Sequence, residues 1–285
     1  MGRVRRYAMG YVLIAPALLA AVVFLFLPMV VSAYWSFTEF NGIRPPRWVG
    51  LDNYLDLFGN PRFLRSLQNT VFFVTFGMGI GPVLGLASAL LLNRARFLQG
   101  LFRTAYFLPV MTSLTVVGTI WKMMLNEQGL LNSLLGFFAL PGHRWLTDPT
   151  TALPSVVAAS IWQGFGFETV VFLAALQSIP RGYYDAAKVD GAAAGALLRH
   201  ITLPALRPTI VFVYVIGIIG SFQVFDQVFV MTNGGPVQAT RTLVFHLYDR
   251  FNSQDLGQAS AVAYVLLAIL ATLSYVQIRL SERGA

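Results

Sequence analysis

The chain has 285 residues, of which 56% are hydrophobic and only 11% are charged, and its mean hydropathy is +0.65. Water-soluble domains carry about 25% charged residues, so this composition excludes a soluble globular protein and indicates a membrane protein. The net charge of +8 does not indicate a nucleic-acid-binding protein, because the basic residues are scattered between apolar segments and form no single patch.

Six apolar segments are long enough to cross a bilayer as helices, which takes about 20 residues each. Helices are expected because lipid offers no partner for unpaired backbone groups. The predicted spans are residues 11–32, 69–92, 104–125, 152–176, 206–228 and 260–280. The predicted fold is therefore an all-α, polytopic membrane protein in which residues 1–285 form a single transmembrane domain.

Positively charged residues are more frequent on one side of the predicted spans. Twelve of the 20 Lys and Arg residues lie in, or within two residues of, the two terminal segments and the connections after the second and fourth spans. Because Lys and Arg are enriched in cytoplasmic loops, we expect both termini to lie in the cytoplasm.

Several kinds of active site are excluded by missing residues. Without cysteine the chain has no disulfide, thiolate nucleophile or Cys-based metal site. Neither Lys122 nor Lys188 follows a glycine, as the phosphate-binding G-x-x-x-x-G-K-[ST] motif requires. His143, His200 and His246 have no further ligands at the spacing of a zinc site. We therefore expect no catalytic residue, no metal site and no cofactor on this chain.

Two acidic residues fall within or beside the apolar spans: Glu168 in the fourth and Asp226 near the outer end of the fifth. Such side chains are costly in lipid and usually face a bundle interior or an aqueous path. For Glu168 we favour an interior hydrogen bond or ion pair over contact with a transported solute, whereas Asp226 suits a solute path or the lipid headgroups equally. An intramembrane enzyme using both as acid and base is a weaker alternative, because they lie on different spans.

The fourth and fifth spans each carry a stripe of polar, small and aromatic residues. These stripes consist of Ser160, Gln163, Gly164 and Phe167, and of Gly217, Ser221 and Val224 with Gln223 beside them. Amides for hydrogen bonds, an aromatic face and glycines for close approach suit a sugar or another polyol. For Gly164, Gly217 and Ser221, helix packing is an equal alternative. Arg and Lys are missing from both stripes, which favours a neutral sugar over a phosphorylated solute.

The connection between the fourth and fifth spans, residues 178–205, predicts a helix, a break and a second helix. Ser178 is expected to cap the first helix, with Pro180 in its first turn and Gly191 just after its end. Small residues and two acids share one region of that helix, at Asp185, Ala186, Val189 and Asp190. This surface suits docking into a groove of a soluble partner; an ordinary alanine-rich loop is the alternative.

This connection resembles the EAA loop of permease subunits from binding-protein-dependent ABC importers. The matching pattern is Asp185-Ala-Ala-x-x-Asp190-Gly-Ala192, followed by Leu198 and Ile201-x-Leu203-Pro204. Asp185 stands where glutamate is usual, and Leu198 stands where an aromatic residue is usual. The resemblance implies that the residues which couple the permease to its ATPase are Tyr184, Asp185, Ala186, Ala187, Asp190, Gly191, Leu203 and Pro204.

Three further segments resemble the carbohydrate-uptake subfamily, which includes the maltose-type first permease and its glycerol-3-phosphate relatives: Gly50-Leu-Asp-Asn-Tyr54, Phe222-Gln-Val-Phe-Asp226 and Thr232-Asn-Gly-Gly-Pro236. The resemblance implies the type I importer permease fold in a prokaryotic inner membrane, and sugar contacts on the two stripes. It also implies a second permease subunit, two ABC ATPase subunits that bind ATP and Mg²⁺, an extracytoplasmic solute-binding protein and membrane lipid as partners, with no nucleic acid. Import of glycerol-3-phosphate or a phosphodiester is the alternative within transport, and a stand-alone channel is a weaker one.

Overall fold

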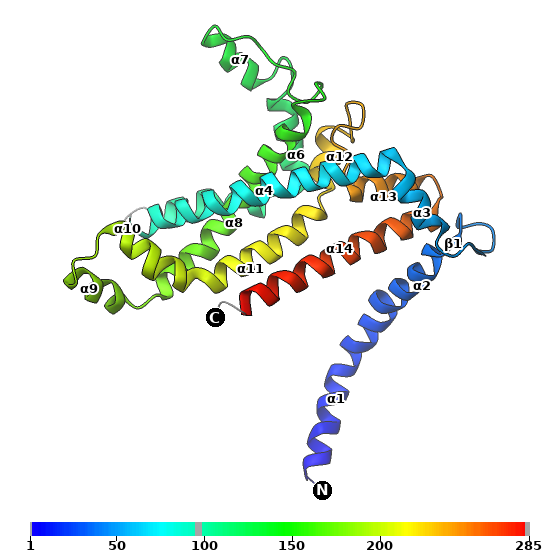
Figure 1. The fold of residues 1–285 in the computed structure, drawn as a ribbon, viewed down its shortest axis with the longest axis horizontal. Helices are drawn as coiled ribbons and strands as arrows, with labels where there is room; N and C mark the ends of the chain where they lie inside the picture. The colour runs from blue at the N-terminus through cyan, green and yellow to red at the C-terminus, as the bar shows by residue number, and fades with distance from the viewer. Residues whose placement is uncertain (1, 95–98, 283–285) are drawn as a thin grey trace. The chain divides into compact units, whose positions relative to one another are not determined.

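The computed structural model describes residues 2–94 and 99–282, and most of them are helical (Figure 1). This confirms the all-α class. The chain forms two compact units: the first contains the residues up to Asn60 together with His246–Val265, and the second contains Pro61–Phe245 and the residues from Leu266 onward. The single domain expected from the sequence stays a prediction, and each unit is described by itself.

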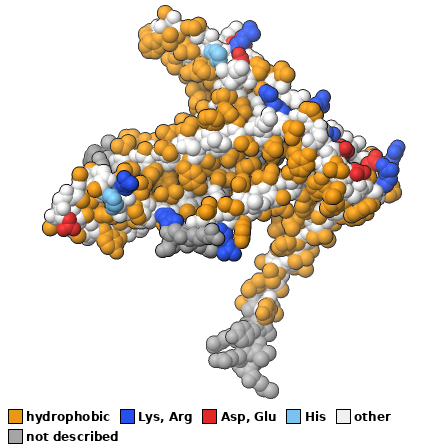
Figure 2. Space-filling model, in the orientation of Figure 1, with side chains coloured by type: hydrophobic (Ala, Val, Ile, Leu, Met, Phe, Trp, Pro, Cys, Tyr) orange, Lys and Arg blue, Asp and Glu red, His pale blue; other side chains and the backbone are white. Residues whose placement is uncertain are grey.

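Five helical stretches are long and apolar enough to cross a membrane: Tyr11–Ser36, Pro61–Asn93, Ala152–Ser178, Ala194–Phe222 and Leu256–Leu280. They correspond to five of the six predicted spans. On the face shown in Figure 2, hydrophobic side chains cover the sides of the long helices, and charged side chains gather at helix ends and connections. This distribution is the one expected for helices that are surrounded by lipid.

The predicted third span, residues 104–125, is divided into two helices and remains a candidate for one bent span. Two helices occupy it, α5 (Gln99–Met111) and α6 (Leu114–Met124), and they are bent by 97° relative to each other. Pro109 lies in the last turn of α5, and Ser113 has extended backbone angles, with ψ at 135°. A proline without an N–H and a residue outside the helical region together end the first helix.

The first unit begins with a long helical segment, α1 (Gly2–Ala21), the π-helical turn η1 (Val22–Phe26) and α2 (Leu27–Ser36). It continues with β1 (Thr38–Glu39), β2 (Arg47–Trp48) and α3 (Asp52–Gly59), and it includes most of α13 (Leu243–Asn252) and the start of α14 (Leu256–Glu282). The most apolar stretch of Tyr11–Ser36 has no buried residue. No described residue of its own unit therefore covers this stretch.

Asn53, from the Gly50–Tyr54 segment, organises the turn that follows α2. Its side-chain amide donates to the carbonyl oxygens of Ser36 and Thr38, both at 2.9 Å. The Tyr54 hydroxyl donates to Ser36 Oγ at 2.8 Å. β1 and β2 then pair antiparallel, with Thr38 opposite Trp48. This segment therefore holds buried backbone groups that the short hairpin leaves unpaired.

The second unit is organised around two long helices, α4 (Pro61–Arg94) and α8 (Ala152–Ser178). Around them lie α5, α6, α7 (Leu130–Phe137), α9 (Arg181–Val189), α10 (Ala194–Leu197), the π-helical turn η3 (Leu198–Thr202), α11 (Leu203–Phe222) and α12 (Asp226–Met231). Glycines bring the helices close together. A Cβ at Gly85 of α4 would lie 2.7 Å from Cβ of Glu168, and one at Gly166 would overlap the carbonyl oxygen of Tyr106 in α5.

Two predicted helix boundaries differ from the structure. α11 ends at Phe222, so the predicted fifth span to residue 228 is too long; Gln223 has left the helical region, and α12 starts separately at Asp226. Ser178 ends α8 and does not cap the next helix, because its hydroxyl donates to the carbonyl of Ala175 in the preceding turn at 2.8 Å. Pro180 occupies the N-cap position of α9 instead.

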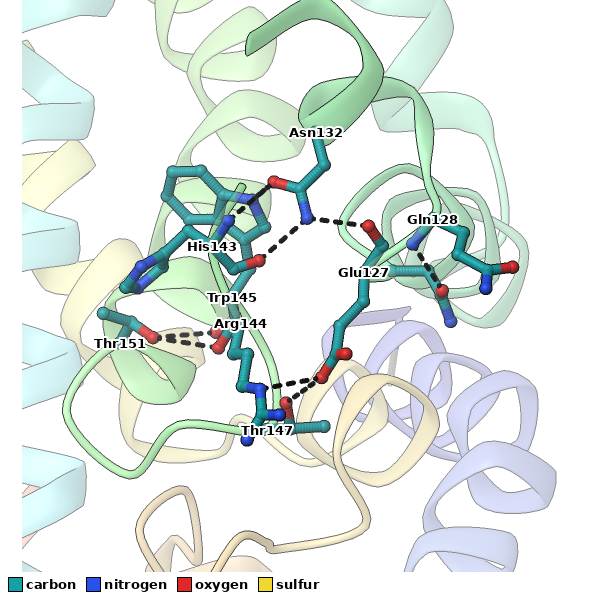
Figure 3. Close-up of polar contacts among 9 residues, drawn as sticks. Glu127, Gln128, Asn132, His143, Arg144, Trp145, Thr147 and Thr151 are labelled. Atoms are coloured by element: carbon teal, nitrogen blue, oxygen red, sulfur yellow. Dashed lines mark hydrogen bonds and ion pairs between the residues drawn. The ribbon is translucent and has the colours of Figure 1, made fainter. Parts of the chain in front are cut away.

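The connection between α6 and α8 is held together by Asn132 of α7 (Figure 3). Its amide nitrogen donates to the carbonyls of Glu127 and His143, at 3.0 and 2.9 Å. Its amide oxygen accepts from the His143 N–H and from the Trp145 indole N–H. The Glu127 carboxylate accepts from Thr147 at 3.1 Å and pairs with Arg144 at 3.4 Å. One asparagine therefore ties both ends of this connection to α7.

Candidate solute path and coupling helix

A cavity of about 330 Å³ lies in the second unit, between α4, α8, α11 and α12. All ten residues that the sequence assigned to a solute path line it: Ser160, Gln163, Gly164, Phe167, Glu168, Gly217, Ser221, Gln223, Val224 and Asp226. The two predicted stripes therefore face the same space. α4 adds a third wall, which includes Met78 and Gly81.

Gln163 is fixed by a partner that the sequence analysis did not identify. Its Oε1 accepts a hydrogen bond from Nε2 of Gln227 at 3.1 Å, and both side chains are buried. Gln227 lies on α12 and also lines the cavity. The sequence does carry a signal for Gln227: it lies four residues after Gln223 in a segment that is apolar except for Asp226. The prediction of one continuous helix through residue 228 obscured this signal.

The small residues of the two stripes have different surroundings. A Cβ at Gly217 would overlap the Met78 side chain of α4, which indicates close helix packing. A Cβ at Gly164 would have no described atom within 4 Å, although Gly164 lines the cavity. Packing therefore accounts for Gly217, whereas Gly164 leaves open space next to Gln163.

Glu168 is 9% exposed and lines the cavity from α8. Its Oε2 is buried and has no hydrogen-bond partner within the described part of the chain. The interior hydrogen bond or ion pair that the sequence favoured is therefore absent at this atom. The space it occupies comes from a glycine, because a Cβ at Gly81 would lie 3.1 Å from Oε2. Asp226, by contrast, is exposed at the first position of α12.

The predicted coupling residues lie on and around α9, at one end of α4, α8 and α11 (Figure 1). Tyr184, Asp185, Ala186 and Ala187 are within α9, Asp190 and Gly191 follow it directly, and Leu203 and Pro204 begin α11. Asp185, Ala186 and Asp190 are exposed. The Asp185 carboxylate lies 3.8 Å from Nζ of Lys188, so part of its charge is balanced within the helix.

Gly191 ends α9 in a left-handed conformation, with φ at +82°. The Gly191 N–H donates to the carbonyl of Lys188 and the Ala192 N–H donates to that of Ala187, at 3.0 and 2.9 Å. These two bonds form a Schellman motif, in which glycine is favoured because it has no Cβ. No described atom lies within 4 Å of a Cβ at Gly191. The glycine is therefore required by the backbone angle and not by close packing within this chain.

α9 is attached to the start of α11 through Thr202, a residue that the sequence analysis missed. The Tyr184 hydroxyl lies 3.0 Å from Thr202 Oγ1, and Thr202 also donates to the carbonyl of Leu197 at 3.3 Å. Thr202 is buried. This contact joins α9 to the residue that directly precedes α11.

Comparison with known protein families matches residues 81–284 to the binding-protein-dependent transport system inner membrane component. The chain belongs to this family. The resemblance of its 178–205 segment to importer permeases is thereby confirmed, and the protein is a multi-pass inner-membrane permease.

Similar proteins align with nearly the whole length of this permease. The lactose transport system permease protein LacF of Rhizobium radiobacter is 34% identical over 276 residues, which are 94% of this chain and 92% of LacF. The trehalose/maltose transport system permease protein MalF of Thermococcus litoralis is 30% identical over 281 residues, covering 98% of this chain and 95% of MalF. A bacterial ABC transporter involved in import of the acidic polysaccharide alginate contains a chain with the same fold, with a TM-score of 0.88, 24% identity and coverage of 98% and 97%.

Proposed function

We propose that this permease translocates a sugar or oligosaccharide into the cytoplasm as one half of a heterodimeric pore in an ATP-driven ABC importer. The observation that carries the proposal is the cavity on which both stripes converge. It offers amide groups from Gln163, Gln223 and Gln227, the hydroxyl of Ser221 and the aromatic ring of Phe167. Amide and hydroxyl groups recognise polyol hydroxyls, and an aromatic face covers the C–H side of a sugar ring.

The names of similar proteins support a carbohydrate as the solute. Relatives that match over nearly the whole chain are named for the transport of lactose, of trehalose and maltose, and of starch degradation products. A glycerol-3-phosphate or phosphodiester solute would require cationic groups, whereas the described residues that line the cavity include no Lys, Arg or His.

In the proposed importer, an extracytoplasmic solute-binding protein delivers the sugar, and two separate ABC ATPase subunits bind ATP and Mg²⁺. Both termini and α9 lie on the cytoplasmic side. Closure of the ATPase dimer displaces α9, and the Tyr184–Thr202 contact passes that displacement to α11, which forms one wall of the cavity. The loaded binding protein and ATP thus both shift the equilibrium of the helical bundle between two conformations.

The test is reconstitution of the permease in liposomes with its second permease, ATPase subunits and binding protein. We expect ATP-dependent uptake of a sugar, and neither uptake nor ATP hydrolysis when this chain is reconstituted alone. Sustained ATP hydrolysis by the purified chain, after contaminating ATPases are removed, would contradict the assignment of ATP hydrolysis to separate subunits. Transport of a non-carbohydrate solute, with no uptake of any sugar tested, would contradict the proposed substrate class.

A further inference from the structure

We propose that Glu168 is a substrate-binding group, whose carboxyl accepts saccharides with hydroxyl or ammonium donors and excludes saccharides with carboxylate or phosphate groups at that position. This inference rests on the proposed sugar import and adds the charge class of the sugar. It starts from an unusual feature of the cavity: an acidic side chain that is nine-tenths buried and has an unpartnered oxygen.

The neighbouring helix supplies space for this carboxyl but no donor. Gly81 and Gly85 of α4 lie against Glu168, and a Cβ at Gly81 would come within 3.1 Å of Oε2 and 3.2 Å of Oε1. The two glycines allow the side chain to fit between α4 and α8. Since glycine has no side-chain donor, this packing supplies no hydrogen bond to Oε2.

The charges around the cavity have one sign. Glu168 and Asp226 are the ionisable side chains among the described residues that line it, and both are acidic. A buried carboxyl without a partner is costly, so a molecule that fills the cavity and donates a hydrogen bond to Oε2 gains stabilisation. Sugar hydroxyls and the ammonium groups of amino sugars are such donors. A carboxylate or phosphate brings a second negative charge and no donor, so it is disfavoured.

This geometry distinguishes a binding role from simple packing. A packing role needs the volume of the side chain but not its charge, so Glu168→Gln preserves it. A binding role needs the negative charge and two acceptor oxygens, which Glu168→Gln removes while leaving the shape. Glu39→Gln is a matched control, because Glu39 is an exposed acid that does not line the cavity.

The first measurement identifies the charge of the solute. The complete importer, reconstituted with its binding protein, is supplied with maltotriose, lactose, xylotriose, glucosamine trimer, galacturonic acid trimer and glucose 6-phosphate. We expect uptake of one or more neutral or amino sugars and none of the acidic compounds. Uptake of an acidic sugar would overturn the inference but leave sugar import intact. Uptake of no saccharide would contradict the proposed function itself, and the inference with it.

The second measurement tests Glu168 directly. With the transported sugar, we expect Glu168→Gln to raise KM about tenfold, corresponding to one lost charge-assisted hydrogen bond, while Glu39→Gln stays at the unmutated value. A KM within about twofold of the unmutated value would assign Glu168 to packing, since one such bond is worth more.

A third measurement needs no variant and covers the case in which Glu168→Gln does not assemble. Dicyclohexylcarbodiimide modifies carboxyl groups in apolar surroundings, and mass spectrometry locates the modified residue. We expect the transported sugar to slow modification of Glu168 about tenfold, because bound sugar covers the carboxyl. An unchanged rate at saturating sugar would overturn the inference.

Discussion

Gln163 on α8 and Gln227 on α12 are joined by a buried hydrogen bond of 3.1 Å between Oε1 of the first and Nε2 of the second. α12 follows α11 after a short non-helical segment, so this bond ties the end of one cavity wall to the other. The bond also orients the Gln163 amide. The positions of Gln163 and Gln227 are therefore coupled.

We expect Gln227→Ala to destabilise the permease by about 1–3 kcal/mol, because it leaves the buried Gln163 carbonyl without a donor. The double variant Gln163→Ala with Gln227→Ala should cost less than the sum of the two single variants. Thermal unfolding in detergent, measured for all four proteins, provides the cycle. Additive single effects would show that the two amides do not interact in solution.

Phe167→Ala should change the transport of some sugars more than others. The ring lines the cavity and is 37% exposed, so it is available to a solute. Aromatic contacts of this kind are worth about 0.5–1.5 kcal/mol, which corresponds to a change in KM of about two- to tenfold. Phe212→Ala is the control, because Phe212 is exposed on α11 outside the cavity lining. Equal losses for every sugar in both variants would favour a packing role.

The same substitution should destabilise the permease at one glycine of α8 and have little effect at another. Gly166→Ala places a methyl group against the Tyr106 carbonyl oxygen, whereas Gly164→Ala meets no described atom within 4 Å. We expect Gly166→Ala to destabilise the contact of α8 with α5 by at least about 1–3 kcal/mol, and Gly164→Ala to assemble normally. Recovery of folded permease in detergent measures both. Equal recovery would contradict the close approach at Gly166.

Gly191→Leu should impair coupling through the backbone. At φ +82° a residue with a branched side chain is strained by about 1–2 kcal/mol, so the Schellman motif at the end of α9 is weakened. Gly191→Asn is the matched control, because asparagine tolerates this conformation better. We expect sugar-stimulated ATP hydrolysis to fall sharply for leucine and to be largely retained for asparagine. Similar losses for both would indicate that a partner needs the space above Gly191.

Reversing the acidic charges in α9 and at its end tests the proposed contact with the ATPase. Asp185 and Asp190 are exposed, and the Asp185 pair with Lys188 is exposed as well, so their contribution to the stability of this chain is small. We expect Asp185→Lys with Asp190→Lys to reduce co-purification of the ATPase at least about tenfold through like-charge contacts. Asp185→Asn with Asp190→Asn should have a smaller effect. If the lysine variant retains both the ATPase and its coupling, this segment is not the coupling element.

Much of the cavity was predictable because helical periodicity is local. The spacing of Ser160, Gln163, Gly164 and Phe167 places them on one face of any helix. The polar residues among them identify that face as one that points away from lipid. The partners were not predictable. Gln227 meets Gln163 only because α11 ends early, and Gly81 accommodates Glu168 only because two distant helices pack together.

The directions of the helices could not be predicted from the sequence either. Residues 104–125 are mostly apolar and contain one charged residue, Lys122, but hydropathy reports whether a segment avoids water and not whether it is straight. The bend after α5 depends on the backbone angles at Ser113. The role of Asn53 in the β1–β2 turn was missed for a similar reason, because its acceptors belong to a hairpin too short to leave a periodic pattern.

Whether the number of membrane crossings is odd or even depends on the bent pair α5 and α6. Five crossings, one for each of the other candidate helices, would leave the two chain ends on opposite sides of the bilayer. An even number is reached only when α5 and α6 together complete one passage. A cytoplasmic location for both ends therefore requires these two short helices, despite their angle of 97°, to bring the chain across.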